Sequence, residues 1–242
     1  MRSKLLSLIL IFLSCHKEIT PKLFYSIGDV KSGETNFSTG GKSIAVISFP
    51  NHLGRCIIKL YPESSVSFSY AYVRLKKITV NISSYNGMIF LLSQDCNIKV
   101  GEDMSCSECE AFLKDKSFEV IEGKMKYKDI FIRKGFGYIP SERRMYALKP
   151  KINPVFPRDK QEVTIPLFLW EKRDDVEKYF IELSLDPEFL NPIYCVTTEE
   201  NKFFPDQMTL KIFSRRIYWR IIYEDKYGIG GFPSSPQEMI IP

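Results

Sequence analysis

Short runs of alternating apolar and polar side chains recur along the chain, and each of them predicts a β-strand. In the run at residues 56–61, for example, Cys56, Ile58 and Leu60 would share one face of a strand. The same reasoning predicts strands at residues 43–49, 66–70, 78–82, 88–92, 117–121, 125–132, 165–170, 179–185, 217–223 and 239–241.

Turn-forming residues separate these runs. Asn86-Gly87 is a strong signal for a β-hairpin, and Gly40-Gly41 marks another bend. Residues 24–139 contain no ten-residue amphipathic pattern of the kind that predicts a helix. The aromatic content of 14%, together with frequent Val and Ile, is also typical of strands. The sequence therefore predicts an all-β protein, built as a sandwich, a barrel or a β-helix.

A proline-rich stretch divides the chain into two parts. Three prolines fall within residues 149–157, and proline at this density stiffens and extends a chain. We place a domain boundary there, with one domain at residues 23–148 and a second at 158–242. About seven short strands in the second domain fit a small β-sandwich, and Trp170 and Trp219 are expected in its core.

The first fifteen residues have a different pattern. A basic start precedes an apolar run at residues 5–13, and Cys15 follows a small residue. This run is too short to cross a bilayer as a helix, which needs about 20 residues. It matches the pattern of a removed secretory signal. A buried core helix is the weaker alternative, because the run has no polar face to set against solvent.

With its cysteine directly after the small residue, this segment resembles a bacterial lipoprotein signal peptide. That resemblance implies removal of residues 1–14 and lipid modification of Cys15, which would then hold the protein on a membrane. Residues 15–22, which are short and polar, would form the tether between lipid and fold. An ordinary secretory signal is the alternative. Either way, we expect the protein in the cell envelope, facing the periplasm or the outer surface.

The charge balance argues against nucleic acid as a partner. Removal of Arg2 and Lys4 with the signal leaves 32 basic and 29 acidic residues, a net charge of about +3. Basic pairs such as Arg143-Arg144 are spread among acidic residues and form no stripe.

Five cysteines remain after Cys15, and in an oxidising compartment one or two disulfides are expected among them. Cys106 and Cys109 have the spacing of a local disulfide, a redox motif or half of a zinc site. We expect a disulfide, either local or linking this pair to Cys96; free thiols are the alternative. No metal site is predicted, since zinc would need two further ligands and the only histidines are His16 and His52.

The first domain resembles the FecR-type extracytoplasmic domain over roughly residues 24–139. One departure is residues 114–117, which read Lys-Asp-Lys-Ser where the family usually has Arg-Gly-Thr before its Phe-x-Val strand. The resemblance implies a right-handed, β-helix-like double sheet that binds or senses without catalysis. Four blocks in the family's order carry the resemblance: residues 39–45 (TGGKSIA), 57–66 (IIKLYPESSV), 118–125 (FEVIEGKM) and 130–135 (IFIRKG).

The second domain is similar to fibronectin type III-like domains, especially those that follow FecR-type domains. The matching features are the early Trp170, the Tyr-Trp-Arg strand at residues 218–220, and the late Gly-x-Gly-Gly at residues 228–231 with Pro and Ser after it. This resemblance implies a small β-sandwich.

No pattern of catalytic residues stands out. The sequence has no Gly-x-Ser-x-Gly elbow, and only His52 is placed to act as a general base. Acidic pairs such as Asp174-Asp175 fall in predicted turns, where carboxylates are usually solvated. We therefore expect no catalysis and no cofactor.

The expected function is that of a lipid-anchored envelope protein that binds another envelope component, either a protein or a glycan. The main alternative is a sensory relay. It would have to act through a separate membrane partner, because the chain offers no segment able to span a membrane. An envelope hydrolase is the less favoured third reading.

Overall fold

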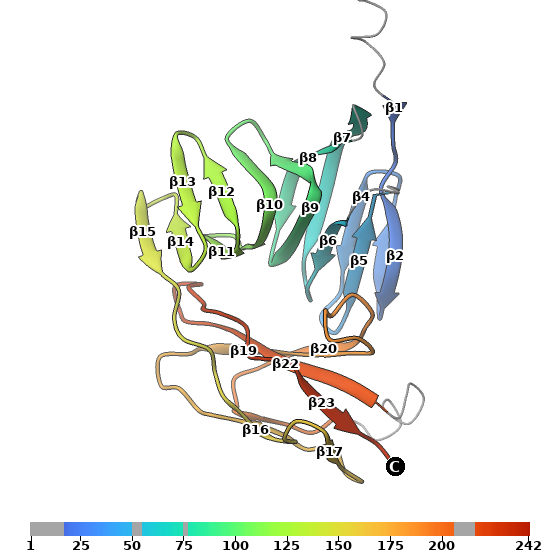
Figure 1. The fold of residues 1–242 in the computed structure, drawn as a ribbon, viewed down its shortest axis with the longest axis vertical. Coiled ribbons are helices and arrows are strands. Elements are labelled where there is room, and N and C mark those ends of the chain that lie inside the picture. The colour runs from blue at the N-terminus through green and yellow to red at the C-terminus, as the bar shows by residue number, and fades with distance from the viewer. Residues whose placement is uncertain (1–16, 50–54, 75–76, 206–215) are drawn as a thin grey trace, which may run out of the picture.

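The computed structural model describes residues 17–49, 55–74, 77–205 and 216–242, and every regular element in these ranges is a β-strand (Figure 1). The prediction of an all-β protein is therefore confirmed. Cys15, the signal peptide before it and both histidines lie outside the described residues. Within the described ranges no helix is long and apolar enough to cross a membrane.

The first unit of the fold is one 15-stranded sheet that curls until it is nearly closed (Figure 1). Its main path runs β15-β14-β11-β10-β9-β8-β7-β4-β3. The strands are β1 (Lys17–Glu18), β2 (Lys22–Ile27), β3 (Val30–Ser32), β4 (Asn36–Thr39), β5 (Ile44–Ser48), β6 (Cys56–Leu60), β7 (Ser65–Arg74), β8 (Lys77–Asn86), β9 (Ile89–Val100), β10 (Met104–Leu113), β11 (Phe118–Glu122), β12 (Lys124–Tyr127), β13 (Ile130–Arg133), β14 (Phe136–Ile139) and β15 (Arg144–Ala147).

The long strand β9 joins two walls of this sheet. Its first half, from Ile89 to Ser93, pairs antiparallel with β6, and its second half, from Cys96 to Val100, pairs parallel with β8. Both partners lie on the same side of β9, because β10 runs along the other side. The strand therefore changes neighbour at residues 93–96.

Two sequence predictions are corrected in this unit. Residues 125–132 were expected to form one strand, but they form parts of β12 and β13, which pair as a hairpin. The turn includes Lys128, whose φ is 52°. The segment around Cys106 and Cys109 carried no strand prediction, yet it lies in β10. Its mixture of small, polar and acidic side chains hides the alternation that identifies the other strands.

The second unit consists of two small sheets packed around one core. Trp170 and Trp219 are both fully buried there, as predicted, with Trp170 in an edge-to-face contact with Tyr179 at 5.5 Å between ring centroids. One sheet contains β16 (Pro154–Phe156), β18 (Phe168–Trp170) and β21 (Lys202–Phe203). The other contains β17 (Gln161–Glu162), β23 (Gln237–Ile240), β22 (Arg216–Glu224), β19 (Lys178–Ser184) and β20 (Pro192–Thr198).

Three apolar layers run through the molecule. One lies inside the curled sheet of the first unit, one inside the second unit, and a third lies between the two units. In this middle layer, Val46 of β5 and Phe90 of β9 meet Phe180 of β19 and Ile222 of β22. The strands β5, β6 and β19 are therefore buried on both faces over most of their length. The alternation that places Cys56, Ile58 and Leu60 on one face of β6 is correct, but the opposite face is buried as well.

The two segments expected to act as tether and linker both lie against the fold. In the described part of residues 15–22, Lys17 and Glu18 pair with β7, and the Ile19 amide donates to the Ala71 carbonyl at 2.9 Å. In residues 149–157, the Pro150 carbonyl accepts a hydrogen bond from the Tyr223 hydroxyl at 2.5 Å. The same stretch continues into β16, so it forms part of the second unit's sheet.

Candidate functional site: the junction between the units

A lysine lies in the apolar layer between the two units. Lys59, in β6, is fully buried. Its Nζ lies 2.5 Å from Glu182 Oε1 of β19 and donates to the Phe189 carbonyl at 2.8 Å. These contacts join positions more than 120 residues apart in sequence, so Lys59 connects the first unit to the second.

Glu182 is shared by a second cation. Arg220 of β22 places Nη2 2.8 Å and Nε 2.9 Å from Glu182 Oε2. The Tyr61 hydroxyl donates to the same oxygen at 3.1 Å and accepts from Arg220 Nη2 at 3.3 Å. One buried carboxylate therefore lies between two cations, and each of its oxygens has a donor. We call Lys59, Tyr61, Glu182 and Arg220 the junction cluster.

Burial and charge oppose one another in the junction cluster. Burial lowers the pKa of Lys59 to about 8, although Glu182 acts against this shift. Burial alone would raise the pKa of Glu182, but Arg220 and Lys59 together outweigh it and hold the pKa below its ordinary value. With both cations charged the cluster carries one net positive charge, and release of the Lys59 proton leaves a neutral Glu182–Arg220 pair.

A second buried ion pair also connects the two units. Lys114 Nζ lies 3.0 Å from Glu119 Oε2, and both side chains are buried. Glu119 Oε1 accepts from the Tyr146 hydroxyl at 3.0 Å and from the backbone amide of Gly230, in the second unit, at 2.6 Å. Position 230 has no room for a side chain, because an added Cβ would lie 2.5 Å from the Tyr223 carbonyl oxygen.

A polar cleft of about 710 Å³ lies between the units, beside these two clusters. Its walls come from both units, and Met88 and Phe180 of the middle apolar layer line it in part. Around them stand charged side chains of both signs, including the exposed Lys116 of the first unit and the exposed Glu177 and Lys226 of the second. Such a lining can bind a polar ligand through several hydrogen bonds and ion pairs.

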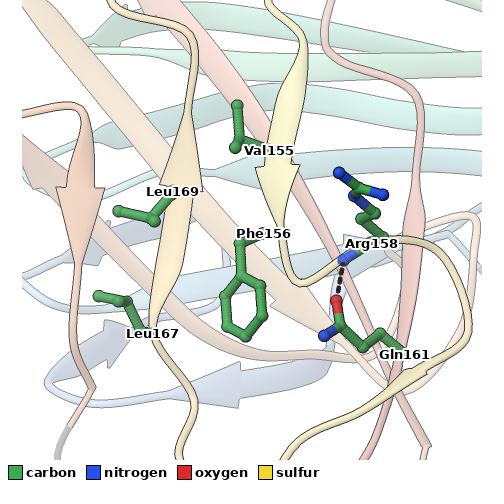
Figure 2. Close-up of a pocket in the computed structure, with 6 residues that line it drawn as sticks. All are labelled: Val155, Phe156, Arg158, Gln161, Leu167 and Leu169. Atoms are coloured by element: carbon green, nitrogen blue, oxygen red, sulfur yellow. Dashed lines mark hydrogen bonds between the residues drawn. The ribbon is translucent and has the colours of Figure 1, made fainter.

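A second hollow, of about 630 Å³, lies beside β16 and β18 and is mainly apolar (Figure 2). Val155, Phe156, Leu167 and Leu169 line it. The hydrogen bond drawn in Figure 2 joins two residues that line this hollow: the Arg158 backbone amide donates to Gln161 Oε1 at 2.9 Å. It belongs to the second unit alone, whereas the cleft draws on both units.

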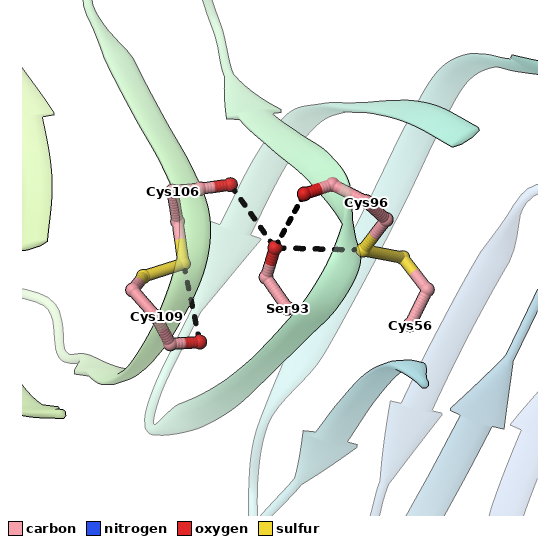
Figure 3. Close-up of a disulfide and its surroundings, with 5 residues drawn as sticks. All are labelled: Cys56, Ser93, Cys96, Cys106 and Cys109. Carbon is pink, nitrogen blue, oxygen red and sulfur yellow. Dashed lines mark hydrogen bonds between the residues drawn. A yellow bond between two sulfur atoms is a disulfide. The ribbon is translucent and has the colours of Figure 1, made fainter. Parts of the chain in front are cut away.

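The structure places four of the cysteines around the point where β9 changes neighbour (Figure 3). Cys106 and Cys109 form a disulfide, and Cys96 forms one with Cys56, a partner that the sequence did not single out. The Ser93 hydroxyl lies between the two bridges and donates to the Cys96 carbonyl at 2.7 Å (Figure 3). Among the described residues, no group of three or more His, Cys, Asp or Glu side chains is arranged to hold a metal ion.

Sequence reasoning did not find the residues that meet at the junction. One signal was present: Lys59, Glu182 and Arg220 each lie between apolar neighbours within a predicted strand. The remaining cysteine, Cys195, is buried in the same layer, and burial raises the pKa of its thiol well above the ordinary value. Low reactivity follows, because the thiolate is the nucleophile.

The chain matches no protein-family model and no curated protein sequence.

Proposed function

We propose that the chain is a lipid-anchored protein of the bacterial cell envelope that works by binding, with a FecR-type domain followed by a fibronectin type III-like sandwich. The observation that carries this proposal is the cleft whose walls come from both units. Two buried charge clusters connect those walls. A surface that is already held in its binding shape loses less entropy when a partner binds, which favours recognition.

Two features support a location in the cell envelope, outside the cytoplasm. Residues 1–15 have the pattern of an export signal ending in a modifiable cysteine. Four of the described cysteines are arranged as two disulfides, which persist outside the cytoplasm and are rare within it. A single acyl chain binds a membrane only marginally, so stable anchoring requires more than one. The lipoprotein resemblance implies several on Cys15.

The chemistry of the cleft indicates the kind of partner. Charged side chains of both signs stand at its rim, and its lining is mainly polar. A purely apolar ligand would leave these groups unpaired, at a cost in free energy. A polar partner, either a loop of an envelope protein or a glycan, fits this lining.

Site-specific photocrosslinking in the native bacterium tests the proposal. A photoreactive amino acid is placed at Lys116 or Lys226 on the cleft rim, and at the exposed Lys160 or Lys172 as matched controls. We expect a discrete adduct from the rim positions and none from the controls. Equal labelling from all four positions, or no adduct from either rim position, would overturn the assignment of the cleft as the binding surface.

The anchor is tested separately. Cells fed a labelled fatty acid should incorporate it into the wild-type protein, and the Cys15→Ser variant should remain unlabelled and leave the membrane fraction. Label that persists in Cys15→Ser would contradict lipidation at this residue.

A further inference from the structure

On the outer face of β7, β8 and the second half of β9, side chains are exposed or partly buried. Strand register aligns its side chains in rows across the sheet. One row runs from Glu18 through Tyr72 and Thr79 to Asn97, and the next runs from Tyr70 through Asn81 to Lys99. The neighbouring residues in sequence, such as Ala71, Val80 and Ile98, point the other way into the core of the first unit.

Aromatic rings and cations gather on this face. Tyr70 and Tyr72 stack on one another with 5.7 Å between ring centroids. Arg74 and Lys77 are exposed beside them, and Lys99 is half-buried. Within the part of the chain that the structure describes, these three cations form no ion pair. We call Tyr70, Tyr72, Arg74, Lys77 and Lys99 the β7–β9 face; Glu18 is an acidic neighbour of Tyr72, so the charges here sum to a positive excess.

The proposed lipid attachment point lies next to this face. Lys17 is opposite Val73 and Glu18 is opposite Tyr72, so β1 extends the sheet at the edge of β7. Cys15 is two residues before Lys17 in sequence. Two residues of chain span at most about 7 Å. A lipid on Cys15 would therefore hold the edge of the β7–β9 face close to the headgroups.

We propose that the β7–β9 face rests on the membrane and contacts anionic lipid headgroups. This inference rests on the proposed anchoring at Cys15. Tyr side chains favour the membrane interface, and Lys and Arg are attracted to anionic surfaces. Neighbouring strands are about 4.8 Å apart, so Lys99, on the third strand from β1, lies about 14 Å across the sheet from it. The second unit lies at the far end of the molecule from β1 (Figure 1).

A chemically anchored protein tests this orientation. The chain from residue 15 onward carries one reactive thiol on Cys15, because the other cysteines are in disulfides or, for Cys195, buried. It is coupled to a maleimide-bearing lipid in phosphatidylcholine vesicles with 30% phosphatidylglycerol. An amine-reactive reagent then labels exposed lysines, which are quantified by mass spectrometry. We expect labelling of Lys77 and Lys99 to fall at least ~5-fold relative to the same chain in solution, the change corresponding to about 1 kcal/mol per cation.

The exposed Lys160 and Lys172 of the second unit serve as internal controls and should keep their labelling rate. If the labelling rates of Lys77 and Lys160 change by the same factor between solution and vesicles, the proposal is overturned. Protection that appears on neutral vesicles and increases with the density of coupled chains would also overturn it, since that result indicates contact between copies of the chain.

A charge-matched pair of variants separates this face from net charge. Arg74→Gln/Lys77→Gln/Lys99→Gln removes the three cations of the face, and Arg158→Gln/Lys160→Gln/Lys172→Gln removes one Arg and two Lys from the second unit. Both variants are tested without coupling to lipid. We expect the fraction of protein that sediments with the same anionic vesicles to fall at least ~10-fold for the first variant and much less for the second. Equal losses would overturn the proposal. Because coupling supplies the anchor, these outcomes are independent of the fatty-acid experiment, whose failure would overturn only the anchoring on which the inference rests.

Discussion

Glu182 has the largest individual role at the residue scale, because it is the shared anion of the junction cluster. Two cations taken out of water would repel one another and lose their hydration. Glu182 offsets both costs, with Oε1 facing Lys59 and Oε2 facing Arg220. The stability of the cluster therefore depends unequally on its three charged members.

Replacement of the shared anion should destabilise the protein far more than replacement of one cation. Glu182→Gln leaves the buried Lys59 and the largely buried Arg220 without a counter-charge, for which we expect a loss of about 3–5 kcal/mol in the free energy of unfolding. Lys59→Met keeps the Glu182–Arg220 pair and leaves the Phe189 carbonyl unpaired, for which we expect a loss of about 1–3 kcal/mol. Urea denaturation measures both values.

The exposed pair of Glu200 and Lys202 supplies the control, since Glu200→Gln should change the free energy of unfolding by less than about 1 kcal/mol. A smaller loss for Glu182→Gln than for Lys59→Met would contradict the shared-anion account.

Lys59 should also make stability depend on pH in the alkaline range. Its pKa is about 8 in the folded protein and 10.5 ordinarily. Between these values the unfolded chain holds the proton and the folded chain has released it. The free energy of unfolding therefore rises with pH in this window through Lys59. Urea denaturation at pH 7.5, 8.5 and 9.5 should show this rise in the wild type and a smaller one in Lys59→Met. Identical slopes in the two proteins would contradict the depressed pKa.

At the scale of elements, β9 and its neighbours decide the shape of the first unit. The first half of β9 pairs with β6 and the second half pairs with β8. The Cys56–Cys96 disulfide links β9 to β6 where the pairing partner changes. Nearby, Gly123 allows β11 to turn into β12 with a φ of 73°, where an added Cβ would lie 2.1 Å from the Glu108 carbonyl oxygen. Backbone packing of this closeness requires glycine.

The two disulfides should contribute unequally to stability. Cys56 and Cys96 are 40 residues apart, whereas Cys106 and Cys109 are three apart. In the loop-entropy model, the first bridge stabilises by about 4 kcal/mol and the second by about 1–2 kcal/mol. Thermal unfolding of Cys56→Ala/Cys96→Ala and Cys106→Ala/Cys109→Ala should show the larger loss for the first pair. The opposite order would indicate that the first bridge does not restrict the unfolded chain.

At the scale of the whole molecule, the two units share a core. The middle apolar layer takes residues from β5, β6, β9 and β10 on one side and from β19, β20 and β22 on the other. The linker is bonded to the second unit as well, since the Lys149 ammonium lies 2.8 Å from Asp225 Oδ2. The cleft therefore has walls that cannot separate without exposing this layer. If the β7–β9 face rests on the membrane, the junction holds the cleft in one orientation to it.

Local order was predictable from the sequence. Alternation within β6, β19 and β22 marks each strand and the face that turns toward its own unit's core, because a strand's side chains alternate whatever it packs against. Residues 125–132 show the limit. The two-residue turn at Lys128 and Asp129 moves the core-facing positions from Met125 and Tyr127 to Ile130 and Ile132, and a prediction of one continuous strand overlooks this change. The sequence by itself therefore determined the fold class and the approximate strands.

Only the tertiary structure decided which strands are also buried on the face that turns away from their own unit's core. By alternation alone, Lys59 and Glu182 would belong to solvent-facing sides of their strands. Packing of the two units covers those sides and brings together groups more than 100 residues apart, which no local pattern encodes. The same holds for the Cys56–Cys96 pair and for the position of β1 beside Tyr72, because both depend on how the sheet curls back on itself.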